Sequence, residues 1–123
     1  MPYHLVVTDG GKKDGLVYGS FKVYDDKGHE VGHRQWIYGL GTSNQAEYRA
    51  LIVALTWCLN HDIMSVVVIM DSKLIINQVL ENWECRNVIL KQLNLRAKEL
   101  IESFESFNIS YMPERYIKQK LGH

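Results

Sequence analysis

The sequence has little that could cross-link the chain and no segment that could anchor it in a membrane. It has only 2 cysteines, and Cys58 and Cys85 form no CxxC spacing, which argues against a disulfide or a zinc site. No apolar run approaches the ~20 residues that a bilayer-spanning helix needs. The opening MPYHLVV also lacks the charged and then apolar layout of a secretory signal. These absences predict a soluble, cytoplasmic protein with no membrane partner.

Charge of one sign is not in excess either. Lysine and arginine total 14, as do aspartate and glutamate, so a polyanionic partner would need a local basic patch. The five histidines show no HxxxH spacing within an expected helix, which disfavours a zinc hydrolase. Because 46% of the 123 residues are apolar, the chain can form one core, and we expect a single domain over residues 1–123.

The apolar pattern changes period along the chain. After three runs rich in β-branched and aromatic residues, apolar residues recur at helical spacing from Asn44 to Asn60, and SVVVIM is continuous as in a buried parallel strand. This order predicts a mixed α/β fold with a five-stranded mixed sheet, three antiparallel strands and then parallel strands, with helices packed on it. We expect strands at 3–8, 17–25, 30–39, 65–71 and 108–112, helices at 44–60, 72–81 and 87–104, and a closing turn at 117–121.

Acidic residues follow the apolar part of two expected strands. Asp9 and Asp71 converge if these strands are neighbours, because ligands collect at the carboxyl ends of strands in such sheets. Two close carboxylates repel, and a hard divalent cation such as Mg²⁺ is their simplest partner. Glu47, near the start of the expected helix, is a third candidate ligand. The residues alone leave other interpretations open: Asn44 and Glu47 equally suit an N-x-x-E capping box, and both aspartates suit turns.

Three motifs in this order resemble the leading motifs of the type 1 ribonuclease H family. They are TDGG at 8–11, TSNQAEYRALIVAL at 42–55 and MDSKLIINQV at 70–79, and ENWECRN at 81–87 and YMPERYI at 111–117 extend the likeness over nearly the whole chain. The resemblance implies a ribonuclease H-like fold and a monomeric endonuclease that hydrolyses the RNA strand of RNA/DNA hybrids, giving 5′-phosphate products. Two-metal-ion catalysis with Mg²⁺, or with Mn²⁺, is implied, with no small-molecule cofactor. The implied catalytic and metal-binding residues are Asp9, Glu47 and Asp71.

The resemblance also implies contacts to the hybrid. The family reads sugars in the minor groove through small polar groups and backbone amides, and an aromatic and cationic region meets the DNA strand and a phosphate. Helix capping is an equal alternative for the polar residues that open the first helix, and Trp83 could instead cover the edge of the core. The implied minor-groove residues are Gly10, Gly11, Ser43, Asn44 and Ser72, and the implied DNA-strand residues are Trp83, Arg86 and Asn87.

The end of the chain departs from the family pattern. The family places a fourth carboxylate on its last helix, whereas IKQKLGH at 117–123 contains no acid. Glu114 is the nearest acid, and His123 is a weaker candidate because Mg²⁺ prefers oxygen. We therefore expect a slow or manganese-preferring enzyme. The rival hypotheses are a nucleic-acid-binding module with a degenerate site and a small phosphate-responsive α/β domain, although no glycine-rich phosphate loop supports the second.

Overall fold

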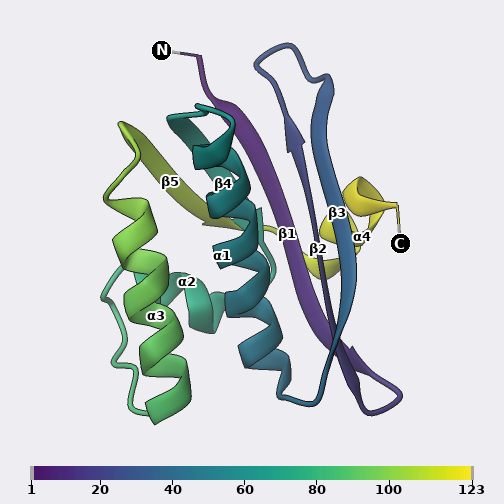
Figure 1. The fold of residues 1–123 in the computed structure, drawn as a ribbon, viewed down its shortest axis with the longest axis vertical. Coiled ribbons are helices and arrows are strands. Elements are labelled where there is room, and N and C mark those ends of the chain that lie inside the picture. Colours follow the sequence, from purple (N-terminus) through teal and green to yellow (C-terminus); the bar gives the residue numbers. More distant parts are fainter. Residues whose placement is uncertain (1, 123) are drawn as a thin grey trace.

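A five-stranded mixed sheet forms the centre of the computed structural model, which describes residues 2–122 (Figure 1). Helices α1, α2 and α3 pack on one face of the sheet, and α4 packs on the other. Within the described residues, no helix is both long enough and apolar enough to cross a membrane. The elements in chain order are β1 (His4–Lys13), β2 (Leu16–Tyr24), β3 (Glu30–Gly39), α1 (Ser43–Asn60), β4 (Ser65–Met70), α2 (Lys73–Val79), α3 (Val88–Ile101), β5 (Ser106–Tyr111) and α4 (Glu114–Leu121).

The strand order in the sheet is β3-β2-β1-β4-β5. Strand β2 pairs antiparallel with β1 and with β3, whereas β4 pairs parallel with β1 and with β5. This arrangement confirms the predicted fold class, with three antiparallel strands followed by parallel ones. The expected closing turn at 117–121 is instead part of a regular helix, α4, which begins at Glu114.

Strand β1 is longer than the sequence suggested, so Asp9 lies in the middle of a strand and not after its end. The expected strand stopped at residue 8 because glycines weaken strands. Pairing with β2 continues the ladder through Asp9 to Lys13. The hairpin closes through Asp14 and Gly15, whose φ values of 53° and 79° suit the primed turns that connect twisted strands. Asp9 is therefore not a turn residue.

Alternation along β1 divides its apolar side chains between two cores. Val6 packs into the larger core, on the side of α1, α2 and α3, and Val7 packs into the smaller core beneath α4. The smaller core also contains Ile117 and Leu121, which are 0% and 2% exposed. These two buried side chains fix α4 on the sheet and thereby set where its polar residues reach.

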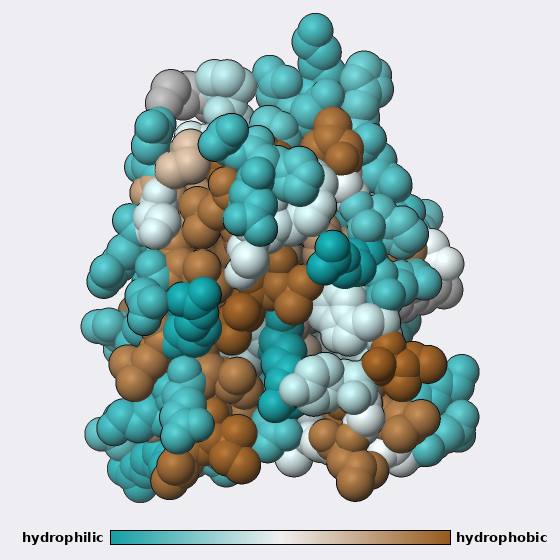
Figure 2. Space-filling model, in the orientation of Figure 1, coloured by the Kyte–Doolittle hydropathy of each residue, from teal (hydrophilic) through white to brown (hydrophobic). Residues whose placement is uncertain are grey.

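On the face that carries α1 and α3, hydrophobic residues are exposed in the middle, between the two helices, and again at the edge where both helices begin, with hydrophilic residues around them (Figure 2). Ile37 and Leu40 near the start of α1, and Val88 and Ile89 at the start of α3, are exposed. The polar residues that open α1 therefore lie at the same end of the molecule as these exposed apolar side chains.

Candidate active site

Three carboxylates converge where β1 runs past the end of β4. Asp9 lies on β1, Glu47 lies on α1, and Asp71 directly follows β4. Strand β1 pairs with β4 only as far as Val7, so beyond that residue its β4 side is open to the start of α1. One carboxylate oxygen from each acid lies within 4.8 Å of the others. The structure thus brings together the three acids that the sequence indicated, and their role as metal ligands stays a prediction.

Helix α1 is capped by residues other than Glu47. The side chain of Thr42 accepts a hydrogen bond of 3.1 Å from the backbone N–H of Gln45, and Gln45 Oε1 accepts one of 3.3 Å from the N–H of Thr42. The suggested capping box of Asn44 and Glu47 is therefore wrong, because the N-cap is Thr42, two residues before Asn44. Glu47 is left to point towards β1.

Close approach of α1 to β1 depends on Gly10. Its backbone N–H donates a hydrogen bond to Oε1 of Glu47. A Cβ on Gly10 would collide with the backbone of Ala46 and lie 2.7 Å from the backbone nitrogen of Glu47. Glycine at this position therefore has a packing reason that does not depend on any contact with substrate.

Burial opposes the negative charge of the acidic cluster. Asp9 and Glu47 are only 3% and 5% exposed. Burial, reinforced by the charges of Asp71 and Asp9, raises the pKa of Glu47 to about 9. Burial also raises the pKa of Asp9 to about 6 and raises that of Asp71. Oε2 of Glu47 is buried and has no hydrogen-bond partner among the described residues. These oxygen ligands and this charge suit a hard divalent cation.

Lys118 reaches the acidic cluster from α4. Its ammonium nitrogen lies 3.6 Å from Oδ2 of Asp9 and 3.6 Å from Oε1 of Glu114, and it donates a hydrogen bond of 3.3 Å to the hydroxyl of Tyr18. Burial opposes the charge, but the negative charge of Asp9 and the contact with Tyr18 prevail and raise the pKa of Lys118. This residue was not predicted from the sequence, because its i,i+4 spacing from Glu114 indicates only the pair within the last helix and not the contact with Asp9.

The fourth carboxylate has two candidates in the sequence. Glu114, the first residue of α4, is largely exposed and pairs with Lys118, and its charge contributes to raising the pKa of Asp9 and Asp71. Glu114 therefore lies near the cluster without belonging to the group of mutually close ligands. His123 lies outside the described residues. The predicted loss of a fourth ligand on the last helix stays a prediction.

The candidate minor-groove residues lie on three elements around the cluster. Gly11 follows Gly10 on β1, and a Cβ there would lie 2.6 Å from the hydroxyl of Tyr18. Ser43 and Asn44 are exposed in the first turn of α1, and neither caps it, because Thr42 does. Ser72 follows Asp71 and caps α2 through a hydrogen bond of 3.2 Å from the N–H of Ile75. Contact of these four residues with substrate stays a prediction.

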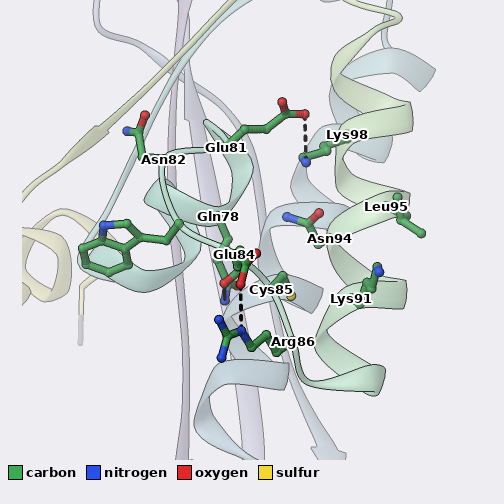
Figure 3. Close-up of a pocket in the computed structure, with 11 residues that line it drawn as sticks. Gln78, Glu81, Asn82, Glu84, Cys85, Arg86, Lys91, Asn94, Leu95 and Lys98 are labelled. Atoms are coloured by element: carbon green, nitrogen blue, oxygen red, sulfur yellow. Dashed lines mark hydrogen bonds and ion pairs between the residues drawn. The ribbon is translucent and has the colours of Figure 1, made fainter.

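The candidate DNA-strand residues lie apart from the carboxylates, around a hollow of about 570 Å³ between the segment after α2 and helix α3 (Figure 3). Trp83 is 51% exposed, which leaves an accessible aromatic surface, and its contact with the DNA strand stays a prediction. Nε of Arg86 lies 2.7 Å from Oε2 of Glu84, and this ion pair is exposed. Asn87 caps α3 by accepting a hydrogen bond of 3.0 Å from the N–H of Leu90, so its side-chain oxygen is already engaged.

Two lysines of α3 line the same hollow and were not singled out in the sequence. Lys91 and Lys98 are one heptad apart, so they lie on the same face of the helix, with Asn94 between them (Figure 3). Lys98 forms an ion pair of 3.0 Å with Glu81. The hollow thus contains three cations, of which Arg86 and Lys98 are paired with Glu84 and Glu81, and Lys91 has no ion pair of this kind among the described residues.

Comparison with known proteins identifies relatives over most of the chain. The profile of the family described as reverse transcriptase-like matches residues 21–118. A bifunctional protein of Mycobacterium tuberculosis is 28% identical over 112 residues, which cover 89% of this chain and 31% of that protein. The ribonuclease HI of Halobacterium salinarum is 33% identical over 75 residues, covering 61% of this chain and 38% of that protein. The chain thus spans about a third of the length of these relatives.

Solved structures share the fold over almost the whole chain. The ribonuclease H1 of Halobacterium salinarum superposes with a TM-score of 0.90 at 24% identity, covering 94% of this chain and 89% of that one. A ribonuclease H1 named LC11, solved in complex with an RNA/DNA hybrid, gives a TM-score of 0.85 at 25% identity with the same coverage. The chain therefore belongs to the reverse transcriptase-like family, and the resemblance to type 1 ribonuclease H that its motifs carry is confirmed.

Proposed function

We propose that this protein is a ribonuclease H, a divalent-metal-dependent endonuclease that hydrolyses the RNA strand of RNA/DNA hybrids. The observation that carries the proposal is the convergence of Asp9, Glu47 and Asp71, with ligand oxygens within 4.8 Å of one another on a ribonuclease H-type fold. The similarity to LC11 ribonuclease H1, which was solved with a hybrid, supports this substrate class. Its action as a cytoplasmic monomer belongs to the same proposal.

The three carboxylates would hold the cations, Mg²⁺ or Mn²⁺, through oxygen ligands. When bound, such cations lower the pKa of an attacking water and stabilise the departing 3′ oxygen, which leaves a 5′-phosphate on the other product. The Gly10 N–H holds the Glu47 carboxylate in place. Burial of Asp9 and Glu47 strengthens their electrostatic interaction with a cation. Because water is the nucleophile, no protein nucleophile is needed.

Substrate binding would use two regions. The exposed Ser43 and Asn44 at the start of α1 are small polar groups suited to sugar hydroxyls in the minor groove. The hollow beside α3 presents Trp83, Arg86 and Lys91 to the DNA strand, combining an aromatic surface with cations for phosphate. An RNA/DNA hybrid that spans both regions would place its RNA strand at the carboxylates.

A second candidate function is binding of hybrids without turnover. The contact between Lys118 and Asp9 favours it, because an ammonium at a metal ligand competes with a divalent cation. This binding module predicts hybrid affinity that is unchanged by Asp71→Asn and no cleavage with either metal. The three converging acids offer the oxygen ligands that a divalent cation prefers, and this favours the enzyme over the binding module.

Cleavage of end-labelled substrates tests the proposal. A hybrid labelled on the RNA strand, the same hybrid labelled on the DNA strand, and matched RNA and DNA duplexes are incubated with Mg²⁺ or Mn²⁺. We expect cutting of the RNA strand of the hybrid alone, with 5′-phosphate ends, and faster cutting with Mn²⁺. Absence of product above background with both metals, beside an active control nuclease, would contradict the enzymatic proposal.

A further inference from the structure

A lysine ammonium stands at a carboxylate that the proposed reaction assigns to a divalent cation. Lys118 lies 3.6 Å from Oδ2 of Asp9, which is itself buried. Two further contacts hold the ammonium, the hydroxyl of Tyr18 at 3.3 Å and Oε1 of Glu114 at 3.6 Å. An isolated ion pair on the surface contributes little free energy. Here, however, the Asp9 carboxylate is buried, and the Lys118 ammonium contacts Asp9, Tyr18 and Glu114.

The backbone beneath Lys118 is also fixed. Its neighbour Ile117 is fully buried in the smaller core, and Leu121, one turn further on, is 2% exposed in the same core. The hydroxyl of Tyr24 donates a hydrogen bond of 3.0 Å to the carbonyl of Lys120, which ties the last turn of α4 to β2. Helix α4 therefore delivers the ammonium to Asp9 from an anchored position, and the side chain is only about a third exposed, at 33%.

A fixed ammonium and a divalent cation on the same carboxylate repel each other, since like charges a few ångströms apart are strongly unfavourable in a buried site. Among the described residues no lysine forms an ion pair with Glu47 or Asp71, although the charge of Lys118 also acts on Asp71 as a minor influence. Oε2 of Glu47 is buried there, and the side chain of Asp71 is its neighbour. The cluster is thus asymmetric, with one part open to a divalent cation and the other already supplied with positive charge.

We propose that Lys118 takes the place of one divalent cation, so that the acidic cluster binds a single divalent ion and the ammonium supplies the second positive charge beside Asp9. This inference rests on the proposed function, because it assigns the two positive charges of that reaction to different sources. It also gives a physical reason for a slow enzyme: a monovalent ammonium stabilises developing negative charge less than a divalent ion does.

Metal stoichiometry tests the inference directly. Isothermal titration of the metal-free protein with Mn²⁺, with bound Mn²⁺ counted independently by electron paramagnetic resonance, is compared among wild type, Lys118→Met and Lys118→Glu. Lys120→Met is the matched control, because Lys120 lies on the same helix but over the ring of Tyr24, at 4.9 Å from its centre. Circular dichroism and a thermal melt establish that each variant is folded before titration.

We expect one Mn²⁺ per chain for wild type and for Lys120→Met. Removing the ammonium in Lys118→Met should tighten Mn²⁺ binding at least about tenfold, and Lys118→Glu, which adds a carboxylate, should bind two ions. Two ions bound to wild type, or equal affinity and stoichiometry in wild type and Lys118→Met, would overturn the inference. Should Lys118→Glu fail to fold, the affinity of Lys118→Met still decides the question.

Hybrid cleavage measured on the same preparations separates the two proposals. Cleavage by a wild-type protein that binds two Mn²⁺ ions would refute the role of Lys118 and leave the ribonuclease proposal intact. One bound Mn²⁺ that rises to two in Lys118→Glu, with no cleavage by either protein, would refute the ribonuclease proposal and support the role of Lys118.

Discussion

Replacing Glu47 by glutamine should stabilise the metal-free protein at alkaline pH. The pKa of Glu47 is about 9 in the folded protein against an ordinary value of 4.5. The folded state therefore retains a proton that the unfolded chain releases, so this residue favours folding most below pH 4.5 and its contribution is lost as the pH rises towards about 9. Glutamine is neutral at every pH and its side-chain oxygen can still accept the hydrogen bond from Gly10.

The size of the effect follows from the pKa difference. At pH 8, which is 3.5 units above 4.5, the unfolded chain has released this proton and the folded protein still holds it. At about 1.36 kcal/mol per unit, the release lowers the free energy of unfolding of the wild type by at most about 5 kcal/mol. Burial of the glutamine amide offsets part of this, leaving a gain in the free energy of unfolding of about 2 kcal/mol. For a domain of this size, that gain raises the Tm by at least about 6 °C. At pH 5 the proton contributes less than about 1 kcal/mol, so the same cost of burying the amide should leave Glu47→Gln less stable than the wild type by about 2 kcal/mol.

Thermal and urea denaturation followed by circular dichroism, with EDTA at pH 5 and pH 8, measures this difference. Glu99→Gln is the matched control, because Glu99 is exposed on α3 and pairs with Arg96 at 2.9 Å, so the difference in stability between this variant and the wild type should be small and nearly the same at the two pH values. Saturating Mn²⁺, at 100 times its Kd, should stabilise the wild type by about 2.7 kcal/mol and the Glu47→Gln variant by less. Equal stability of Glu47→Gln and wild type at pH 8 in EDTA would refute the reasoning.

Three further substitutions test other parts of the site. Gly10→Ala should lower both stability and Mn²⁺ affinity, because the added Cβ meets the backbone of α1, and an unchanged melting curve would contradict this. Tyr48→Phe should lower the free energy of unfolding, measured by urea denaturation, by about 1–3 kcal/mol. The substitution removes the buried hydroxyl that donates a hydrogen bond of 2.7 Å to Oε1 of Gln78. Trp83→Ala should weaken hybrid binding in a filter or fluorescence assay about tenfold with little change in Tm, because Trp83 is half exposed. Unchanged affinity would remove Trp83 from the substrate surface.

The parts of the fold that local pattern decides could be predicted from the sequence. The continuous apolar run SVVVIM gave a parallel strand because it is buried on both sides, between β1 and β5 within the sheet and beneath helices on its faces. The helical spacing after Asn44 gave α1, since its apolar residues face the larger core. The convergence of Asp9 with Asp71 was expected from neighbouring parallel strands, and it holds although β1 continues past Asp9, because the pairing of β1 with β4 stops at Val7.

Features decided by competition between similar residues were harder to predict. Thr42, Ser43 and Asn44 are consecutive and all suit an N-cap, and Thr42 is the cap because Gln45, three residues later, accepts a hydrogen bond from its N–H in return. Glycines after Asp9 indicated the end of a strand, whereas pairing with β2 carried the strand onward.

Lys118 could not be placed from the sequence because its contacts depend on tertiary structure. It meets Tyr18 across 100 positions of the chain. Its reach towards Asp9 depends on how Ile117 and Leu121 dock α4 on the sheet. The sequence shows that this segment is rich in lysine, but it does not show which way the Lys118 side chain points.

The most direct test of the central claim is the rate of RNA-strand cleavage by wild type and Asp9→Asn at saturating Mn²⁺, with hybrid binding measured in parallel. If the three carboxylates jointly hold the catalytic cations, Asp9→Asn should lose at least about a thousandfold in cleavage rate, since metal-assisted stabilisation contributes several kcal/mol, while its affinity for the hybrid stays within a few fold. Equal cleavage by the two proteins would show that the reaction does not use this cluster.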